Sequence, residues 1–299
     1  MEGAYYNGQY LNRLERLGYS QAEIDNKLES TFEEMFYGPE GVRLCHCAGP
    51  DMMYIEDTGN HDVRTEGMSY AMMFCVQMNR QKEFDCLWRW VVTHMYLTEG
   101  ENAGYFAWSC HTDGSKNSDG PAPDGEEFFA MSLFFAANRW GSGEGVLDYA
   151  SWARRILHAC VHKGEEVGSG FPMWNPENHL IKFIPNCEFT DPSYHLPHFY
   201  ELFALWSDEC DRPFWHAAAA ASRQYLRKAC HARTGLSAEY AEYDGRPHRG
   251  DQPDRHDWFF SDAYRTLGNI ALDAQWFGDK DGWAQETAAH IQQFFEEKE

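Results

Sequence analysis

Four acidic residues stand at or near the starts of four predicted helices, in stretches that also carry aromatic residues. The acids are Glu66, Asp124, Asp191 and Asp262, and the aromatic residues are Tyr105, Trp108, Trp174, Tyr194 and Trp258. Aspartate is a favoured helix N-cap, which explains part of the pattern, but capping does not require aromatic neighbours. Aromatic faces stack on sugar rings, and carboxylates accept hydrogen bonds from hydroxyl groups. Two carboxylates on opposite sides of a glycosidic bond can cleave it, so the pattern favours a carbohydrate site.

Glu66 lies in the segment NHDVRTEGMSYAMM, residues 60–73, which is otherwise apolar and rich in small residues. We predict that Asp62 or Thr65 caps a helix and that Glu66 falls in its first turn. Burial would favour the protonated carboxyl group, whereas the helix N-terminus would favour the anion, so its protonation state stays open. The alternative interpretation is that Glu66 only complements the helix dipole.

Helical periodicity dominates the chain and predicts the elements that must position these acids. The predicted helices are Ser20–Phe36 (with a capping box), Thr65–Gln77, Glu83–Leu97, Glu126–Asn138, Leu147–His162, Tyr194–Trp206, Pro213–Cys230, Ser261–Trp276 and Gly282–Glu297. Short strands are possible at 52–55 and 180–184, and the segments 99–125, 164–192 and 233–257 read as loops. Helix pairs recur every 60 to 70 residues or so, which is typical of a toroid of helical hairpins. The long connections would then gather on one face, with the acids around one rim.

Composition excludes several classes of partner. The 299 residues carry 47 acids and 25 bases, a net charge of −22. Such a surface repels nucleic acid and anionic membranes and suits a neutral or cationic ligand. Aromatic residues make up 16% of the chain, which is compatible with buried packing and with an aromatic-lined cleft.

Nine cysteines with irregular spacing, including one C-x-C at Cys45 and Cys47, do not form a zinc-ribbon pattern. The cluster around His46 is read as accidental loop composition. We expect no signal peptide and no membrane span, because the first 20 residues lack an apolar core and no apolar run is long enough. Reduced thiols in a cytoplasmic protein are the simplest interpretation.

Four segments, in this order, resemble the motifs of glycoside hydrolase family 8: TEGMSYAMM, APDGEEFFAMSLFFAANRWG, DPSYHLPHFYELF and SDAYR. Within this family, the segments NHDVRTEGMSYAMM and GPAPDGEEFFA are most similar to the motifs of the branch that releases xylose from the reducing end of xylo-oligosaccharides. The resemblance runs from about Tyr5 to the C-terminus and implies one catalytic domain over residues 1–299. It also implies an all-α fold, an (α/α)6 barrel, and an inverting mechanism.

The resemblance also implies roles for seven residues. Glu66 matches the general acid and Asp262 the general base, the pair that an inverting mechanism needs. The implied substrate-binding residues are Asp124, which would bind and distort the sugar, Tyr194 near the attacking water, Arg265 beside the base, and Trp108 and Trp174 as less secure stacking positions. No cofactor and no metal ion is implied, and a monomer or weak oligomer is expected.

The chain departs from the family pattern in its number of helices. We expect about ten, whereas the family barrel has twelve, so the fold is expected to be shortened at the C-terminus. This leaves two alternatives open: an endo-acting xylanase or glucanase of the same family, and a non-catalytic carbohydrate-binding remnant. The presence of both Glu66 and Asp262 argues against the second alternative.

Overall fold

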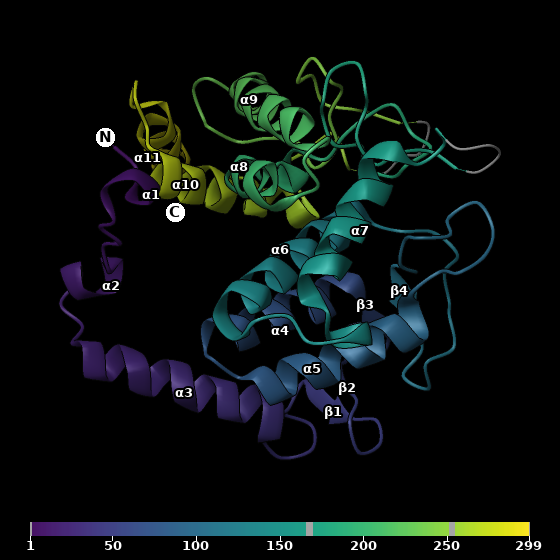
Figure 1. Cartoon of the computed structure of the whole chain (residues 1–299). Helices are drawn as coiled ribbons and strands as arrows, with labels where there is room; N and C mark the ends of the chain where they lie inside the picture. Colours follow the sequence, from purple (N-terminus) through teal and green to yellow (C-terminus); the bar gives the residue numbers. More distant parts are fainter. Residues whose placement is uncertain (1, 166–169, 251–254, 299) are drawn as a thin grey trace. The chain divides into compact units, whose positions relative to one another are not determined.

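The computed structural model describes residues 2–165, 170–250 and 255–298, and these are mainly helical (Figure 1). Their α-helices are α1 (Ala4–Asn7), α2 (Arg13–Arg16), α3 (Gln21–Tyr37), α4 (Thr65–Gln77), α5 (Gln81–Trp90), α6 (Pro123–Trp140), α7 (Tyr149–His162), α8 (Pro197–Trp206), α9 (Arg212–Ala229), α10 (Arg265–Phe277) and α11 (Trp283–Glu296). A π-helix, η1 (Val91–Met95), follows α5, and three short 3-10 helices are η2 (Gly145–Leu147), η3 (Pro192–Tyr194) and η4 (Ser261–Tyr264).

Four short strands form two antiparallel pairs. β1 (Cys45–Cys47) pairs with β2 (Met53–Ile55), and β3 (Val63–Arg64) pairs with β4 (Ser109–Cys110). β2 confirms the strand predicted at 52–55. The strand predicted at 180–184 is reduced, among the described residues, to a single bridge between Trp174 and Ile181. Residues 166–169 and 251–254 of the predicted loops lie outside the described residues.

The chain divides into two compact units, which we describe separately. The first unit comprises Met1–Gly8, Ala122–Glu127 and Ala153–Glu299, and the second comprises Gln9–Pro121 and Phe128–Trp152. None of the described helices combines the length and the apolar character needed to cross a bilayer.

In the second unit, local sequence signals decide most element boundaries. The predicted capping box is present at α3: Ser20 Oγ accepts from the Glu23 amide at 3.3 Å, and Glu23 Oε2 accepts from the Ser20 amide at 2.8 Å. The helix predicted from Thr65 to Gln77 is confirmed as α4. It packs against α5, and the two helices carry buried apolar side chains: Met68, Met72, Phe84, Leu87 and Trp88.

The predicted cap of α4 is wrong. The N-cap residue is Arg64, and no side chain caps the helix. Strand β3 runs directly into α4, so Thr65 is already helical, and its amide donates to the Trp108 carbonyl at 2.9 Å. The Asp62 carboxylate is engaged elsewhere, because it accepts hydrogen bonds from Arg64 and Ser109.

Two other predicted helices are interrupted. The helix predicted from Glu83 to Leu97 changes to a π-helix at Val91, where a run of β-branched residues begins and crowds the preceding turn. The helix predicted from Tyr194 begins as η3, and the α-helix starts only at Pro197. Proline has no amide proton, so it suits the first turn of a helix and interrupts a longer one.

The first unit is built around α8, which is buried on most sides between α9 and α10 (Figure 1). A guanidinium group ties the three helices together. Arg223 on α9 donates to both carboxylate oxygens of Asp273 on α10, at 2.9 and 2.7 Å, and to Glu201 on α8. A bidentate pair of this kind fixes the orientation of two helices as well as their distance.

Candidate active site

Arg265, the first residue of α10, gathers several of the predicted site residues in the first unit. Its Nη1 donates to Asp124 Oδ2 at 3.0 Å, and its Nη2 lies 3.0 Å from Asp262 Oδ2. The guanidinium carbon lies 5.7 Å from the centre of the Tyr194 ring. Three predicted partners from three separate segments therefore contact one cation.

The two carboxylates on Arg265 differ in their access to water. The Asp262 side chain is 42% exposed, whereas that of Asp124 is 4% exposed. Asp262 follows Ser261, whose φ of 42° lies in the left-handed region that a serine rarely adopts. Strain of this kind is concentrated at functional sites. The arrangement leaves one carboxylate in contact with solvent and holds the other in the protein interior.

Burial changes the protonation of the acids in this cluster. It raises the pKa of Asp124 to about 6, against the opposing effect of Arg265. It also raises the pKa of Asp191, the N-cap of η3, to about 7, again opposed by Arg265. Asp191 Oδ1 accepts from the Ser193 amide at 2.6 Å. For both Asp124 and Asp191, burial therefore outweighs the effect of Arg265 and favours the protonated carboxyl group more than in water.

Two buried residues that the sequence analysis did not single out support Tyr194. Glu127 lies on α6 one turn after Asp124, and the Tyr200 hydroxyl oxygen lies 2.5 Å from its Oε1. The same hydroxyl donates to the Tyr194 carbonyl at 3.1 Å. Burial raises the pKa of Glu127 well above its usual range. The Tyr200 hydroxyl group therefore bridges the buried Glu127 carboxyl group and the Tyr194 backbone.

A second contact holds the same turn. Asn269 on α10 donates from Nδ2 to the Ser193 carbonyl at 2.7 Å.

The sequence contained one signal for Glu127, the i, i+3 spacing from Asp124, since this spacing places both acids on one helix face. No comparable local signal points to Asn269.

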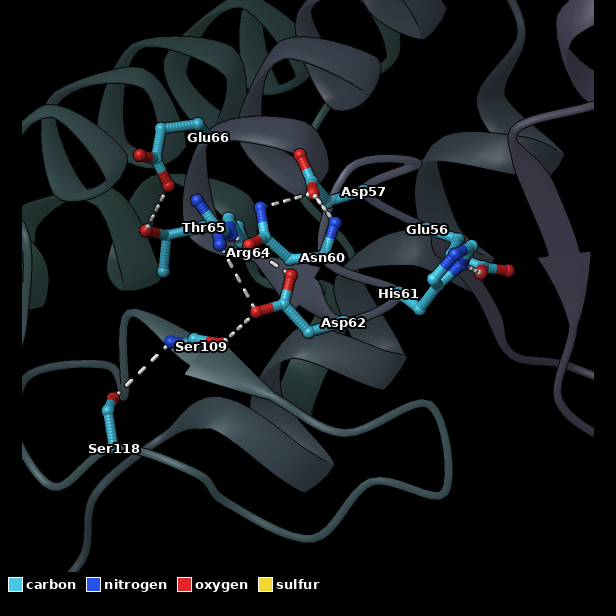
Figure 2. A network of polar contacts seen from close by, with 10 residues as sticks. All are labelled: Glu56, Asp57, Asn60, His61, Asp62, Arg64, Thr65, Glu66, Ser109 and Ser118. Atoms are coloured by element: carbon cyan, nitrogen blue, oxygen red, sulfur yellow. Dashed lines mark hydrogen bonds and ion pairs between the residues drawn. The ribbon is translucent and has the colours of Figure 1, made fainter.

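In the second unit, Glu66 occupies the first turn of α4 (Figure 2). Glu66 and Trp108 are both partly exposed. Glu66 Oε2 accepts from Thr65 Oγ1 at 3.3 Å, and the Thr65 amide binds the Trp108 carbonyl. One backbone hydrogen bond, from Thr65 to Trp108, therefore joins the segment of the predicted acid Glu66 to the segment of one predicted stacking residue. We call this contact the junction.

A polar network under this junction holds it in place, as Figure 2 shows. Asp62 accepts from Arg64 Nε at 3.0 Å and from Ser109 Oγ at 2.9 Å, which links the two residues that face each other across β3 and β4. The Arg64 guanidinium lies over the Trp108 ring at 5.1 Å.

Trp174 requires a correction. Its side chain is 1% exposed and packs edge-on against Trp215 and Tyr200, with ring centres 4.9 and 5.6 Å apart. A ring enclosed by other rings has no free face for a sugar, so Trp174 is a core residue of the first unit and not a stacking platform.

Comparison with known proteins extends these observations. The family model described as glycosyl hydrolases family 8 matches residues 19–298. The chain is 55% identical over 299 residues to the reducing end xylose-releasing exo-oligoxylanase of Halalkalibacterium halodurans, covering all of this chain and 76% of the relative. It is 56% identical over 298 residues to the reducing-end xylose-releasing exo-oligoxylanase Rex8A of Paenibacillus barcinonensis, covering 98% of this chain and 77% of the relative.

A solved structure of Rex8A complexed with xylose matches with a TM-score of 0.95 and 56% identity, over 98% of this chain and 78% of that one. The likeness covers nearly the whole chain, and the described residues are mainly helical. The predicted fold class, all-α of the (α/α)6 type, is confirmed.

Proposed function

This chain belongs to family 8 of the glycosyl hydrolases, and we propose that it hydrolyses β-1,4-xylo-oligosaccharides and releases xylose from the reducing end with inversion. The identity of 55–56% to two exo-oligoxylanases, over nearly the whole chain, supports this substrate class over other activities of the family.

The observation that carries the proposed chemistry is the pairing of Arg265 with one exposed and one buried carboxylate. Exposure lets water reach Asp262, and the Arg265 guanidinium lies 3.0 Å from its carboxylate, so this group is assigned as the general base. We assign Asp124, which is buried and paired with the same guanidinium, to binding a sugar hydroxyl group. We assign to Tyr194, whose ring lies beside the Arg265 guanidinium, contacts with the attacking water and with the sugar.

The proposed reaction uses two proton transfers. Glu66 gives its proton to the glycosidic oxygen as the bond from that oxygen to the anomeric carbon breaks. Asp262 takes a proton from water, whose oxygen bonds to the anomeric carbon from the opposite face, so the configuration inverts. The products are xylose and an oligosaccharide shortened by one unit, and Glu66 and Asp262 then exchange protons with water. Trp108 would stack on a sugar ring near the acid.

Product analysis tests the proposal. Xylotriose labelled at its reducing end should yield labelled xylose and unlabelled xylobiose from the wild type, and polymeric xylan should yield no internal fragments. Glu66→Ala and Asp262→Asn should lose about 10²- to 10⁴-fold in turnover. Internal fragments from xylan would establish the endo-acting alternative. Equal activity of all three proteins would refute the catalytic assignment, and an inactive wild type would establish the non-catalytic alternative.

We extend the proposal to the compartment and the assembly. All nine cysteines are free thiols, and burial raises the pKa of five of them, Cys45, Cys75, Cys110, Cys160 and Cys230, which makes these thiols poor nucleophiles for disulfide exchange. This usage supports a reducing compartment, and we propose a cytoplasmic location. A monomer or weak oligomer stays a prediction.

A further inference from the structure

We propose that His158, His162 and Asp211 bind a divalent transition-metal ion of the zinc class, at a site that shares no residue with the proposed hydrolytic machinery. All three residues belong to the first unit. One possible ligand atom from each lies within 4.8 Å of those from the other two.

The geometry of the three side chains suits a small metal ion. His158 and His162 are four residues apart on α7, so they share one helix face, and their ring centres are 4.5 Å apart. Asp211 Oδ2 lies 3.5 Å from His158 Nδ1, and Oδ1 lies 2.7 Å from His162 Nε2. Ligands about 2.0–2.1 Å from a tetrahedral zinc are about 3.3 Å apart, so the first pair is close to this spacing and the second must open by about 0.6 Å.

Asp211 provides an independent indication of a cation. Its side chain is 2% exposed, and among the described residues its Oδ2 accepts no hydrogen bond. It precedes α9 but makes no capping hydrogen bond to that helix. A buried carboxylate oxygen without a donor is unfavourable, and an adjacent cation would satisfy it.

The surroundings supply the features that usually accompany a bound metal ion. His162 Nδ1 lies 2.9 Å from Glu165 Oε2, so the second ring nitrogen is held by a carboxylate, which orients the ring and raises the basicity of its other nitrogen. Cys210 Sγ lies 3.3 Å from Asp211 Oδ1 and is exposed, so a thiolate or water can complete the coordination. Both histidines, Glu165 and Cys210 line a hollow of about 400 Å³ through which an ion can enter.

The ligand set selects the class of ion. Two imidazoles and one carboxylate suit zinc, nickel or copper, whereas magnesium and calcium prefer oxygen ligands alone. A bound ion would join the C-terminal end of α7 to the start of α9 and so stabilise the first unit. The competing explanation is an ordinary histidine–aspartate ion pair, which needs no metal.

Zinc titration of the tag-free 299-residue chain after chelator treatment separates the two explanations. We expect isothermal titration calorimetry to show one Zn²⁺ ion per chain and the Tm to rise with added Zn²⁺, whereas Mg²⁺ should change neither. His158→Ala and Asp211→Asn should each weaken Zn²⁺ binding at least about tenfold. His216→Ala is the matched control: this histidine is also exposed and faces a carboxylate, Glu201 at 3.6 Å, but lies outside the cluster.

The His158→Ala variant decides the result even if Asp211→Asn fails to fold, because the His158 side chain is 53% exposed and contributes little to the core. A wild type that binds no Zn²⁺ at 100-fold excess would overturn the proposal. So would His158→Ala with wild-type affinity, or an equal loss of affinity in His216→Ala.

Discussion

Arg265 donates to Asp124 across 141 residues of sequence, with 3.0 Å between Nη1 and Oδ2. Both side chains are largely removed from water, at 15% and 4% exposure. A charge pair is screened little in such a position, so each partner depends strongly on the other. The same guanidinium also pairs with Asp262, so Arg265 links the exposed Asp262 carboxylate to the buried Asp124.

Arg265→Met should destabilise the protein and reduce turnover. It leaves Asp124 buried without its cation, and breaking a buried pair from one side typically costs about 3–5 kcal/mol. Chemical denaturation at pH 7 measures this loss. Arg227→Met is the matched control, because the Arg227–Asp281 pair is half exposed and should contribute less than about 1 kcal/mol. Equal losses in the two variants would contradict the buried-pair interpretation.

The contribution of Asp124 and Asp191 to the free energy of unfolding should fall as the pH rises from about 4 to about 7. Their folded-state pKa values are about 6 and about 7, above the value of about 3.9 expected in the unfolded chain. The folded state therefore binds more protons in this window, and the stability contributed by the protonated acids is lost as they ionise.

The Asp191→Asn variant isolates this contribution. The amide oxygen can still accept from the Ser193 amide, but the side chain no longer titrates. Its Tm should fall less than that of the wild type between pH 4 and pH 7. Asp51→Asn, at an exposed position, should follow the wild-type curve. Parallel curves for Asp191→Asn and the wild type would show that Asp191 does not titrate there.

Glu66→Ala should lose about 10²- to 10⁴-fold in turnover while the fold is retained. The side chain is only partly buried, so its removal leaves no large cavity. We expect a Tm within a few degrees of the wild type. A Tm far below that value would show that Glu66 is mainly a structural residue that complements the dipole of α4.

Two tryptophans should respond differently to substitution. Trp108→Ala removes a partly exposed ring and should raise KM for xylo-oligosaccharides by about two- to tenfold, the range expected for one aromatic contact. Trp174→Ala removes a buried ring and should cost about 3–5 kcal/mol of stability without changing KM of the folded enzyme. A raised KM for Trp174→Ala alone would reverse the two assignments.

A chelator should leave the rate of hydrolysis unchanged at temperatures well below the unfolding transition. The proposed mechanism transfers protons between carboxyl groups, water and the glycosidic oxygen, and it needs no metal ion. Removal of an ion from the His158, His162 and Asp211 cluster should lower only the Tm. Loss of activity at low temperature, restored by Zn²⁺, would contradict this separation.

Local sequence signals predict where the longer helices lie and which residue types form the candidate site, but they miss the interruptions at η1 and η3. The capping box at Ser20 and the apolar period of α4 act within a few residues, so they appear in the sequence as well as in the structure. The motif order identified Glu66, Asp124 and Asp262 as acids near helix starts. Even here, the cap of α4 was missed, because Asp62 is engaged by Ser109 from a distant segment.

Only the tertiary structure decided which residues share a partner and which reach solvent. Trp108 and Trp174 look alike in sequence, yet one is partly exposed and the other is enclosed by Trp215 and Tyr200. His158 and His162 become a candidate metal site only where Asp211 packs against α7. Burial and long-range pairing depend on how segments remote in sequence pack together, whereas helix formation depends on neighbours within a few residues.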